Sequence, residues 1–264
     1  MIEDLIECRY GTHASNIGAI LAASLAKENP VPIMIADPIV VDELCPEARY
    51  TGHPDYERTS IFHALNTRAV AKRYAEGIGK PYEALNLIMV HMGGGLSIGA
   101  HRHGRVIDVN NCLDGEGAFS TERAGSMPIR DMLDLCYSGE YTREEAFRKL
   151  IGNGGLYAYL GTKDGFEIQN RIEAGDEQAI EVIRAQAYQV AKEIGALAAV
   201  LKGDVDAILL TGGLAYLEPL TEQIKEHVSF IAPVELFPGE DEIGALALAA
   251  YEVMNGEREL KEYA

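Results

Sequence analysis

Two glycine clusters mark the places where phosphate chemistry could occur. The segment HMGGGLS (91–97) follows an apolar run, and LLTGGLAY (209–216) follows another. Glycine lets the backbone approach a phosphate and present its N–H groups. A helix N-terminus after the second cluster would attract an anion as well. Each cluster alone could be a plain tight turn, but two at the ends of strands favour a nucleotide held in a cleft.

Two charged residues near these clusters are candidates for handling a substrate. Arg123 lies in a polar, glycine-rich stretch (110–128) that is too long for a simple connector. Arginine can clamp a carboxylate or a transferring phosphoryl group, although pairing with Glu116 or Glu122 is the alternative. Asp37 follows an apolar run and could orient a substrate or an arginine, or bind a metal. Its alternative is a turn cap.

Histidines and cysteines give weaker signals. His63, in SIFHALN, falls at the start of a predicted helix, but a single histidine is more often structural than catalytic. The same caution applies to His13 and His53. The four cysteines fit neither a metal knuckle nor a CxxC pair. We therefore expect small buried side chains there, and we find no Ser/His/Asp nucleophile apparatus.

The elements that must position these residues alternate between strands and helices, which predicts an α/β fold. Predicted strands cover 1–9, 31–41, 85–91, 97–101, 105–110, 205–210 and 230–234. Predicted helices cover 15–29, 61–79, 128–137, 143–150, 176–202, 217–227 and 241–253. A soft domain boundary is expected after Tyr82.

Composition excludes several classes of protein. The 264 residues are 47% hydrophobic with a net charge of -18, which argues against general nucleic-acid binding and against docking on an anionic membrane. No apolar run approaches the roughly 18 residues of a membrane span. The acidic N-terminus does not resemble a signal peptide, and no disulfide framework is evident, so we expect a cytoplasmic protein.

Taken in order, the motifs resemble those of butyrate kinases, which belong with acetate kinase in the sugar kinase–actin–heat-shock ATPase superfamily. The resemblance runs from near Tyr10 to near Arg258. It rests on GTHASNIGA, ADPIVVDEL, TGHPDYER, SIFHALN, HMGGGLSIGAHRHGRVIDVNN, DGEGAFSTERAGSMP, IGNGGLYAYLGTKD, LTGGLA and FIAPVELFPGEDE. It implies two actin-like (ribonuclease H-like) lobes around a nucleotide cleft, with 1–82 in the N-terminal lobe and 83–264 in the C-terminal, nucleotide-binding lobe.

The resemblance also assigns roles by position. The nucleotide-binding residues it implies are His91, Gly93, Gly94 and Gly95 at the phosphates, Gly212 and Gly213 under the adenosine, and Asp164 near the nucleotide. The catalytic residues it implies are Arg123, His63 and Asp37, with His13 and Arg58 in support. Glu242 matches a carboxylate that helps to position Mg²⁺, although the family's Asn-Glu-Glu run is Asp241-Glu242-Ile243 here.

The implied reaction is in-line transfer of the γ-phosphoryl group of ATP to butyrate, giving ADP and butyryl phosphate. A carboxylate is already ionised near neutral pH, so the protein mainly aligns the reactants and stabilises charge. Acetate, propionate or a branched acid are alternative substrates. Homo-oligomerisation through 176–202 and 241–253 is expected from the family, with core packing as the alternative.

One part of the family pattern has no counterpart in this sequence. Butyrate kinases begin with an Asn-Pro-Gly-Ser-Thr-Ser-Thr-Lys phosphate loop and a later Ser-Arg-Gly-Gly segment, and neither occurs here. We therefore expect either a kinase completed by a separate N-terminal segment or a catalytically incomplete fragment that only binds nucleotide or oligomerises.

Overall fold

The computed structural model describes residues 2–7, 15–28 and 31–260, which fall into two compact units. One unit comprises the described residues up to Pro38 together with those from Asp241 onward, and the other runs from Ile39 to Glu240. The expected boundary after Tyr82 lies inside the second unit, so the division into lobes at that point stays a prediction.

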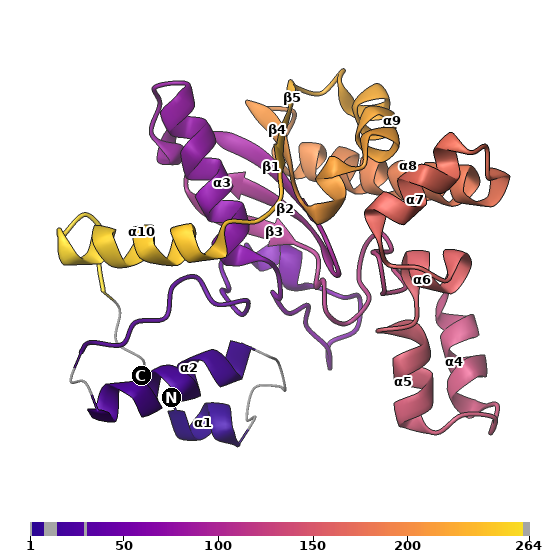
Figure 1. The fold of residues 1–264 in the computed structure, drawn as a ribbon, viewed down its shortest axis with the longest axis horizontal. Coiled ribbons are helices and arrows are strands. Elements are labelled where there is room, and N and C mark those ends of the chain that lie inside the picture. Colours follow the sequence, from indigo (N-terminus) through magenta and orange to yellow (C-terminus); the bar gives the residue numbers. More distant parts are fainter. Residues whose placement is uncertain (1, 8–14, 29–30, 261–264) are drawn as a thin grey trace. The chain divides into compact units, whose positions relative to one another are not determined.

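The second unit contains a five-stranded mixed sheet with the order β3-β2-β1-β4-β5 (Figure 1). The strands are β1 (Asn86–Met92), β2 (Leu96–Arg102), β3 (Arg105–Val109), β4 (Ala207–Gly212) and β5 (Val234–Pro238). The pairs β1–β4 and β4–β5 are parallel, whereas β1–β2 and β2–β3 are antiparallel. Parallel strands end at the same edge, so both glycine clusters lie along one edge of the sheet.

The central strand β1 is buried along its whole length, and its side chains alternate between two helical layers. Leu87 and Met89 pack with α3 (Ala64–Gly77) on one face. Ile88 and Val90 face the core that α8 (Glu177–Val200) and α9 (Glu218–Val228) help to build. This period-two alternation explains why a continuous apolar run was needed for a strand covered on both faces.

Four more helices of this unit, α4 to α7, come after β3 in the sequence. A pair, α4 (Ile129–Tyr137) and α5 (Arg143–Leu150), lies away from the sheet, beyond α6 (Gly155–Leu160), and α7 (Gly165–Glu173) leads into α8 (Figure 1). Short 3₁₀ turns occupy Pro46–Arg49, Tyr82–Ala84 and, as η3, Gly213–Tyr216. The other unit contains α1 (Ile2–Ile6), α2 (Ser15–Glu28) and α10 (Glu242–Met254).

The α/β class is confirmed, and most predicted elements are found within a few residues of their expected bounds. Three predictions were wrong. Residues 2–6 form a helix instead of a strand, since Glu3 and Asp4 in its first turn favour helix through the backbone dipole. Residues 31–41 form no strand and contain a bend at Asp37 and a turn at 39–40, and the strand expected at 230–234 begins only at Val234. In the part of the chain that the structure describes, no helix is long and apolar enough to span a membrane.

Candidate active site

The first glycine cluster forms the turn of the β1–β2 hairpin. The strand register places His91 opposite Ser97, and the Gly93 N–H donates to the Gly95 carbonyl at 2.9 Å to close the turn. The hydroxyls of Ser120 and Thr121 donate to the carbonyls of Gly94 and Gly93, at 2.6 and 2.5 Å. These bonds fix the turn and occupy two carbonyl oxygens, which would otherwise repel an anion.

Two histidines stack beside this turn. The rings of His63 and His91 are 3.8 Å apart between centroids and 15° from parallel. His63 is the N-cap of α3. Asn66, from the first turn of the same helix, accepts a hydrogen bond from His91 Nδ1 through its Oδ1, at 2.9 Å. The helix therefore places one imidazole directly and holds the other through an amide.

Glu240 completes the surroundings of His91. Its Oε1 lies 3.3 Å from His91 Nε2, and the hydrogen bond from His91 lowers the pKa of Glu240 despite partial burial. His91 is almost completely buried, with 1% of its surface exposed. Both ring nitrogens of His91 thus face fixed polar partners, which locks the orientation of the ring.

Arg123 reaches the same turn from the long loop. Its Nη1 donates to the Cys112 carbonyl at 2.8 Å, while its Nε is buried without a hydrogen-bond partner among the described residues. A Cβ built on Gly95 would collide with Arg123 Nη1 and would lie 3.1 Å from His63 Cε1. Arg123 and His63 therefore converge on Gly95, as expected for two groups that act on one anion.

The alternative role considered for Arg123 is not what the structure shows. Glu122 pairs instead with Lys163 at 2.5 Å, and Glu116 pairs with Arg58 at the same distance. Among the described ion pairs, neither carboxylate is matched to Arg123. The guanidinium of Arg123 is thus not held by the surface ion pairs that were its purely structural alternative.

The second glycine cluster touches the first. Gly212 has φ +88, and a Cβ on it would collide with the backbone of Met92, where β1 ends. Its amide and carbonyl are bonded to Gly239, which follows β5. Gly213, by contrast, has nothing within 4 Å of its Cβ position. Gly212 is therefore needed for the close approach of three strand ends, and Gly213 borders open space.

Asp164 lies next to this second cluster and also has a local structural role. Its side chain caps α7 by accepting from the Phe166 N–H at 2.9 Å. The neighbouring Gly165 would place a Cβ 3.5 Å from Leu214 in η3. Among the described contacts, this carboxylate takes part only in the helix cap, and its expected place near a nucleotide stays a prediction.

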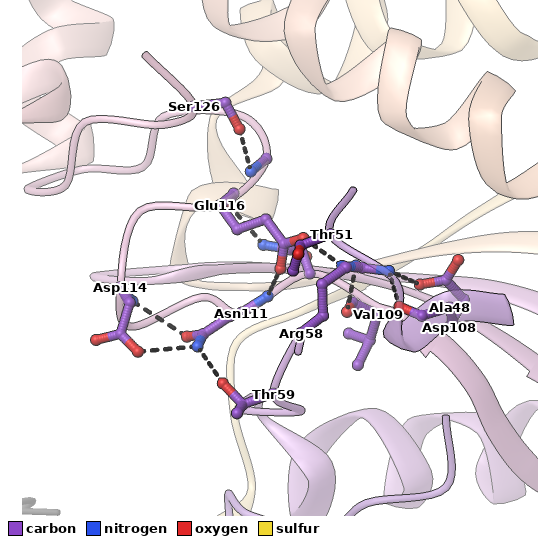
Figure 2. Close-up of polar contacts among 12 residues, drawn as sticks. Ala48, Thr51, Arg58, Thr59, Asp108, Val109, Asn111, Asp114, Glu116 and Ser126 are labelled. Atoms are coloured by element: carbon purple, nitrogen blue, oxygen red, sulfur yellow. Dashed lines mark hydrogen bonds and ion pairs between the residues drawn. The ribbon is translucent and has the colours of Figure 1, made fainter. Parts of the chain in front are cut away.

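Arg58 holds the long loop in place (Figure 2). Its guanidinium bonds Glu116 and Asp108, at 2.5 and 2.9 Å, together with the carbonyls of Ala48 and Val109. Burial alone would lower the pKa of Arg58, but the hydrogen bonds to the two carboxylates outweigh burial and raise it. Arg58 thus ties together the loop that carries Arg123, and its expected supporting role in catalysis stays a prediction.

The remaining predicted residues lie elsewhere. Asp37 and Glu242 belong to the other unit. Asp37 has φ +40 and pairs with Arg258 at 2.8 Å, in keeping with an acid that positions an arginine. Glu242 is the first residue of α10 and is exposed. Their predicted catalytic and metal-binding roles stay predictions, and His13 lies outside the described residues.

Sequence reasoning missed several residues that shape the site. Ser97 was quoted only as part of the loop motif, and Asn66, Cys112, Ser120 and Glu240 were not singled out. Asn66 could have been found from its spacing, since it follows His63 by three residues on a helix and so shares its face. Ser97 could have been found from strand register, because a hairpin that turns at 93–95 places Ser97 opposite His91.

Comparison with known proteins assigns the family. The Acetokinase family matches residues 56–229, which include both glycine clusters, His63 and Arg123. A protein described as "Probable butyrate kinase" from Clostridium botulinum (strain Alaska E43 / Type E3) is 52% identical over 263 residues. The chain belongs to the acetokinase family. The aligned region is 100% of this chain and 74% of that relative's length.

Solved structures agree on the fold of this acetokinase-family chain. Acetate kinase from Porphyromonas gingivalis superposes with a TM-score of 0.79 at 20% identity, covering 96% of this chain and 72% of the other. Acetate kinase from Entamoeba histolytica gives 0.81 at 17% identity, with 96% and 74% covered. A propionate kinase from Francisella tularensis subsp. tularensis gives 0.79 at 17%, with 93% and 71% covered. The expected actin-like fold of acetate kinases is confirmed.

Proposed function

We propose that this chain carries out ATP-dependent phosphorylation of a short-chain carboxylate, with butyrate as the preferred substrate. The observation that carries the proposal is the convergence of His63 and Arg123 on Gly95, in a chain 52% identical to a relative described as a butyrate kinase. Phosphoryl transfer requires alignment and stabilisation of charge on three oxygens, and it requires little else from the protein. A half-buried arginine and a fixed imidazole at a glycine turn meet that requirement.

In this proposal each residue has a limited task. The turn 93–95 lets phosphate oxygens approach the backbone closely, because no side chain intervenes. Arg123 offers its uncommitted Nε, and His63 offers a ring nitrogen, to the oxygens of the phosphoryl group in flight. The η3 segment after Gly212 receives the adenosine side of the nucleotide, next to the N-terminus of α7.

Mg²⁺ fits this chain only as an ion held mainly by the nucleotide. In the described residues, no group of three His, Cys, Asp or Glu side chains could hold a metal ion. Mg²⁺ bound to phosphates keeps several waters and needs only one or two carboxylates, a role that the family resemblance gives to Glu242. When bound, the ion would neutralise charge on the phosphate oxygens.

The test is formation of butyryl phosphate, trapped as its hydroxamate, from butyrate, ATP and Mg²⁺. The chain is assayed alone and with an added segment that carries the family's first phosphate loop, and acetate and propionate are run in parallel. Turnover in either arm, highest with butyrate, is expected. One methylene changes binding by roughly 1–3 kcal/mol, so the three acids should differ by about tenfold or more. Absence of turnover in both arms, with nucleotide still bound, would refute the kinase assignment for this chain.

A further inference from the structure

Two carboxylates border the glycine turn at 93–95. The Oε1 atom of Glu240 lies 3.5 Å from the position of a Cβ built on Gly93, and the Oε1 atom of Glu122 lies 3.7 Å from that of Gly94. The whole chain carries a net charge of -18. Phosphate groups that approach this turn therefore meet negative charge, and nearby cations are needed to offset it.

The two carboxylates have different partners. Glu240 faces the ring of the buried His91, 3.3 Å away, and the other ring nitrogen of His91 is held by Asn66. Glu122 instead pairs with Lys163, whose Nζ lies 2.5 Å from its Oε2. Lysine carries its charge on a flexible four-carbon stem, and 43% of this side chain is exposed. The ammonium of Lys163 can therefore leave Glu122 for another anion, whereas the ring of His91 is fixed.

The loops that carry Glu122 and Lys163 are held by other bonds. The backbone carbonyl of Glu122 accepts hydrogen bonds from the N–H groups of Gly152 and Gly154, at 2.8 and 3.0 Å. Next to Lys163, the hydroxyl of the buried Thr162 takes part in two local hydrogen bonds. An exposed ion pair adds little to stability. The two loops therefore keep their conformation when the ammonium leaves the carboxylate.

We propose that Lys163 binds the terminal phosphates of a nucleoside di- or triphosphate, and that Glu122 holds its ammonium beside the turn until the nucleotide arrives. Lys163 precedes Asp164, to which the family resemblance gives a place near the nucleotide. On binding, the ammonium exchanges one carboxylate for phosphate oxygens, which carry more charge and offer more acceptors. The proposal rests on the proposed function, since it takes the turn at 93–95 to receive phosphates.

A permanent surface ion pair is the alternative, and the substitutions Lys163→Met and Glu122→Gln separate it from the proposal. If the pair only joins two loops, either substitution breaks the same contact, and both should change nucleotide binding in the same direction. If Glu122 competes with the nucleotide for Lys163, loss of the ammonium weakens binding. Loss of the Glu122 charge then has the opposite effect, because it frees the ammonium.

The experiment is titration calorimetry of the chain with ATP and ADP in the presence of Mg²⁺, with AMP measured by displacement of ADP. Lys163→Met should raise the Kd for ATP and ADP tenfold or more, the value of about one charged hydrogen bond, and that for AMP less than about twofold. Glu122→Gln should lower the Kd for ATP roughly two- to fivefold, the value of an exposed ion pair. Lys163→Arg, which keeps the charge, should bind ATP nearly as the wild type does. Lys149→Met is the matched control, because the ammonium of Lys149 lies over the ring of Tyr141 as that of Lys163 lies over Tyr157.

Several results would overturn the proposal. They are an unchanged Kd for ATP in Lys163→Met, equal rises for ATP and AMP in that variant, and an unchanged or raised Kd for ATP in Glu122→Gln. A wild-type chain that binds none of the three nucleotides would refute the proposed function and this role of Lys163 together. A wild-type chain that binds ATP without turning it over would refute only the activity, and the two substitutions would still decide the role of Lys163.

Discussion

Gly95→Ala is the substitution whose consequence follows most directly from the geometry. The φ angle of Gly95 is not positive, so an alanine there meets no backbone strain. The new methyl group would instead overlap Arg123 Nη1 and press on His63 Cε1, 3.1 Å away. Because Nη1 also donates to the Cys112 carbonyl at 2.8 Å, the guanidinium cannot move without losing that bond.

The size of the effect follows from the displacement required. Restoring ordinary van der Waals contact moves the Arg123 guanidinium by on the order of 1 Å, and a misplacement of that size costs about 100-fold in rate. The loss should appear mainly in kcat, since the alignment of the transferring group is what changes. The hydroxamate assay with butyrate, over a range of both substrates, measures it.

Two further substitutions show whether the effect is steric and local. At Gly94 the nearest atom to a new Cβ is Glu122 Oε1 at 3.7 Å, so Gly94→Ala should lose clearly less activity than Gly95→Ala. Gly195, exposed in the middle of α8, has nothing within 4 Å, and Gly195→Ala should raise stability by roughly 0.5–1 kcal/mol without changing kcat. Equal losses at Gly94 and Gly95 would refute the argument that Arg123 and His63 converge on Gly95.

Three stability predictions can be checked by urea unfolding. Arg58→Met leaves Glu116 and Asp108 without their half-buried arginine and should cost about 3 kcal/mol, whereas Arg49→Met, which breaks a more exposed pair, should cost far less. Equal costs would contradict the role of Arg58 in holding the loop. His101 is fully buried with its pKa lowered to about 3, chiefly by burial, so the unfolded chain takes up a proton near pH 6.5 that the folded chain refuses. Stability of the wild type should therefore fall by about 2 kcal/mol more than that of His101→Gln between pH 7 and pH 5, and parallel curves would exclude this cause. Thr142→Ala removes the capping box of α5 and should cost about 1 kcal/mol, which a change within error would disprove.

Much of the fold could be predicted because its strongest signals are local. The seven-residue run of β1 has no polar face to misplace, and α8 carries an aspartate cap and a long apolar stripe. The failures have the same origin. Residues 31–41 are apolar enough for a strand, but strand formation needs a partner edge, and a single sequence does not reveal which edge is available.

The site was predictable only where a residue type restricts chemistry by itself. Glycine clusters and a lone arginine in a polar loop are conspicuous in a sequence, so Gly95 and Arg123 were found. Ser97 and Glu240 act through strand register and through the return of β5. These bring Ser97 to His63, 34 positions away, and Glu240 to His91, 149 positions away. Contacts that arise from chain topology leave no local pattern.

The parallel pairing of β1 with β4 has a consequence for how the chain is made. Ile88 pairs with Ile208, so about 120 residues must be synthesised before β1 acquires its second neighbour. At typical ribosome speeds of 5–20 residues per second, this interval lasts roughly 6 to 24 s. During that time one edge of β1, a strand that is fully buried in the folded chain, is open, although the β2–β3 meander can already form on the other side. Until β4 emerges, this open edge is the part of the sheet most exposed to pairing with another chain.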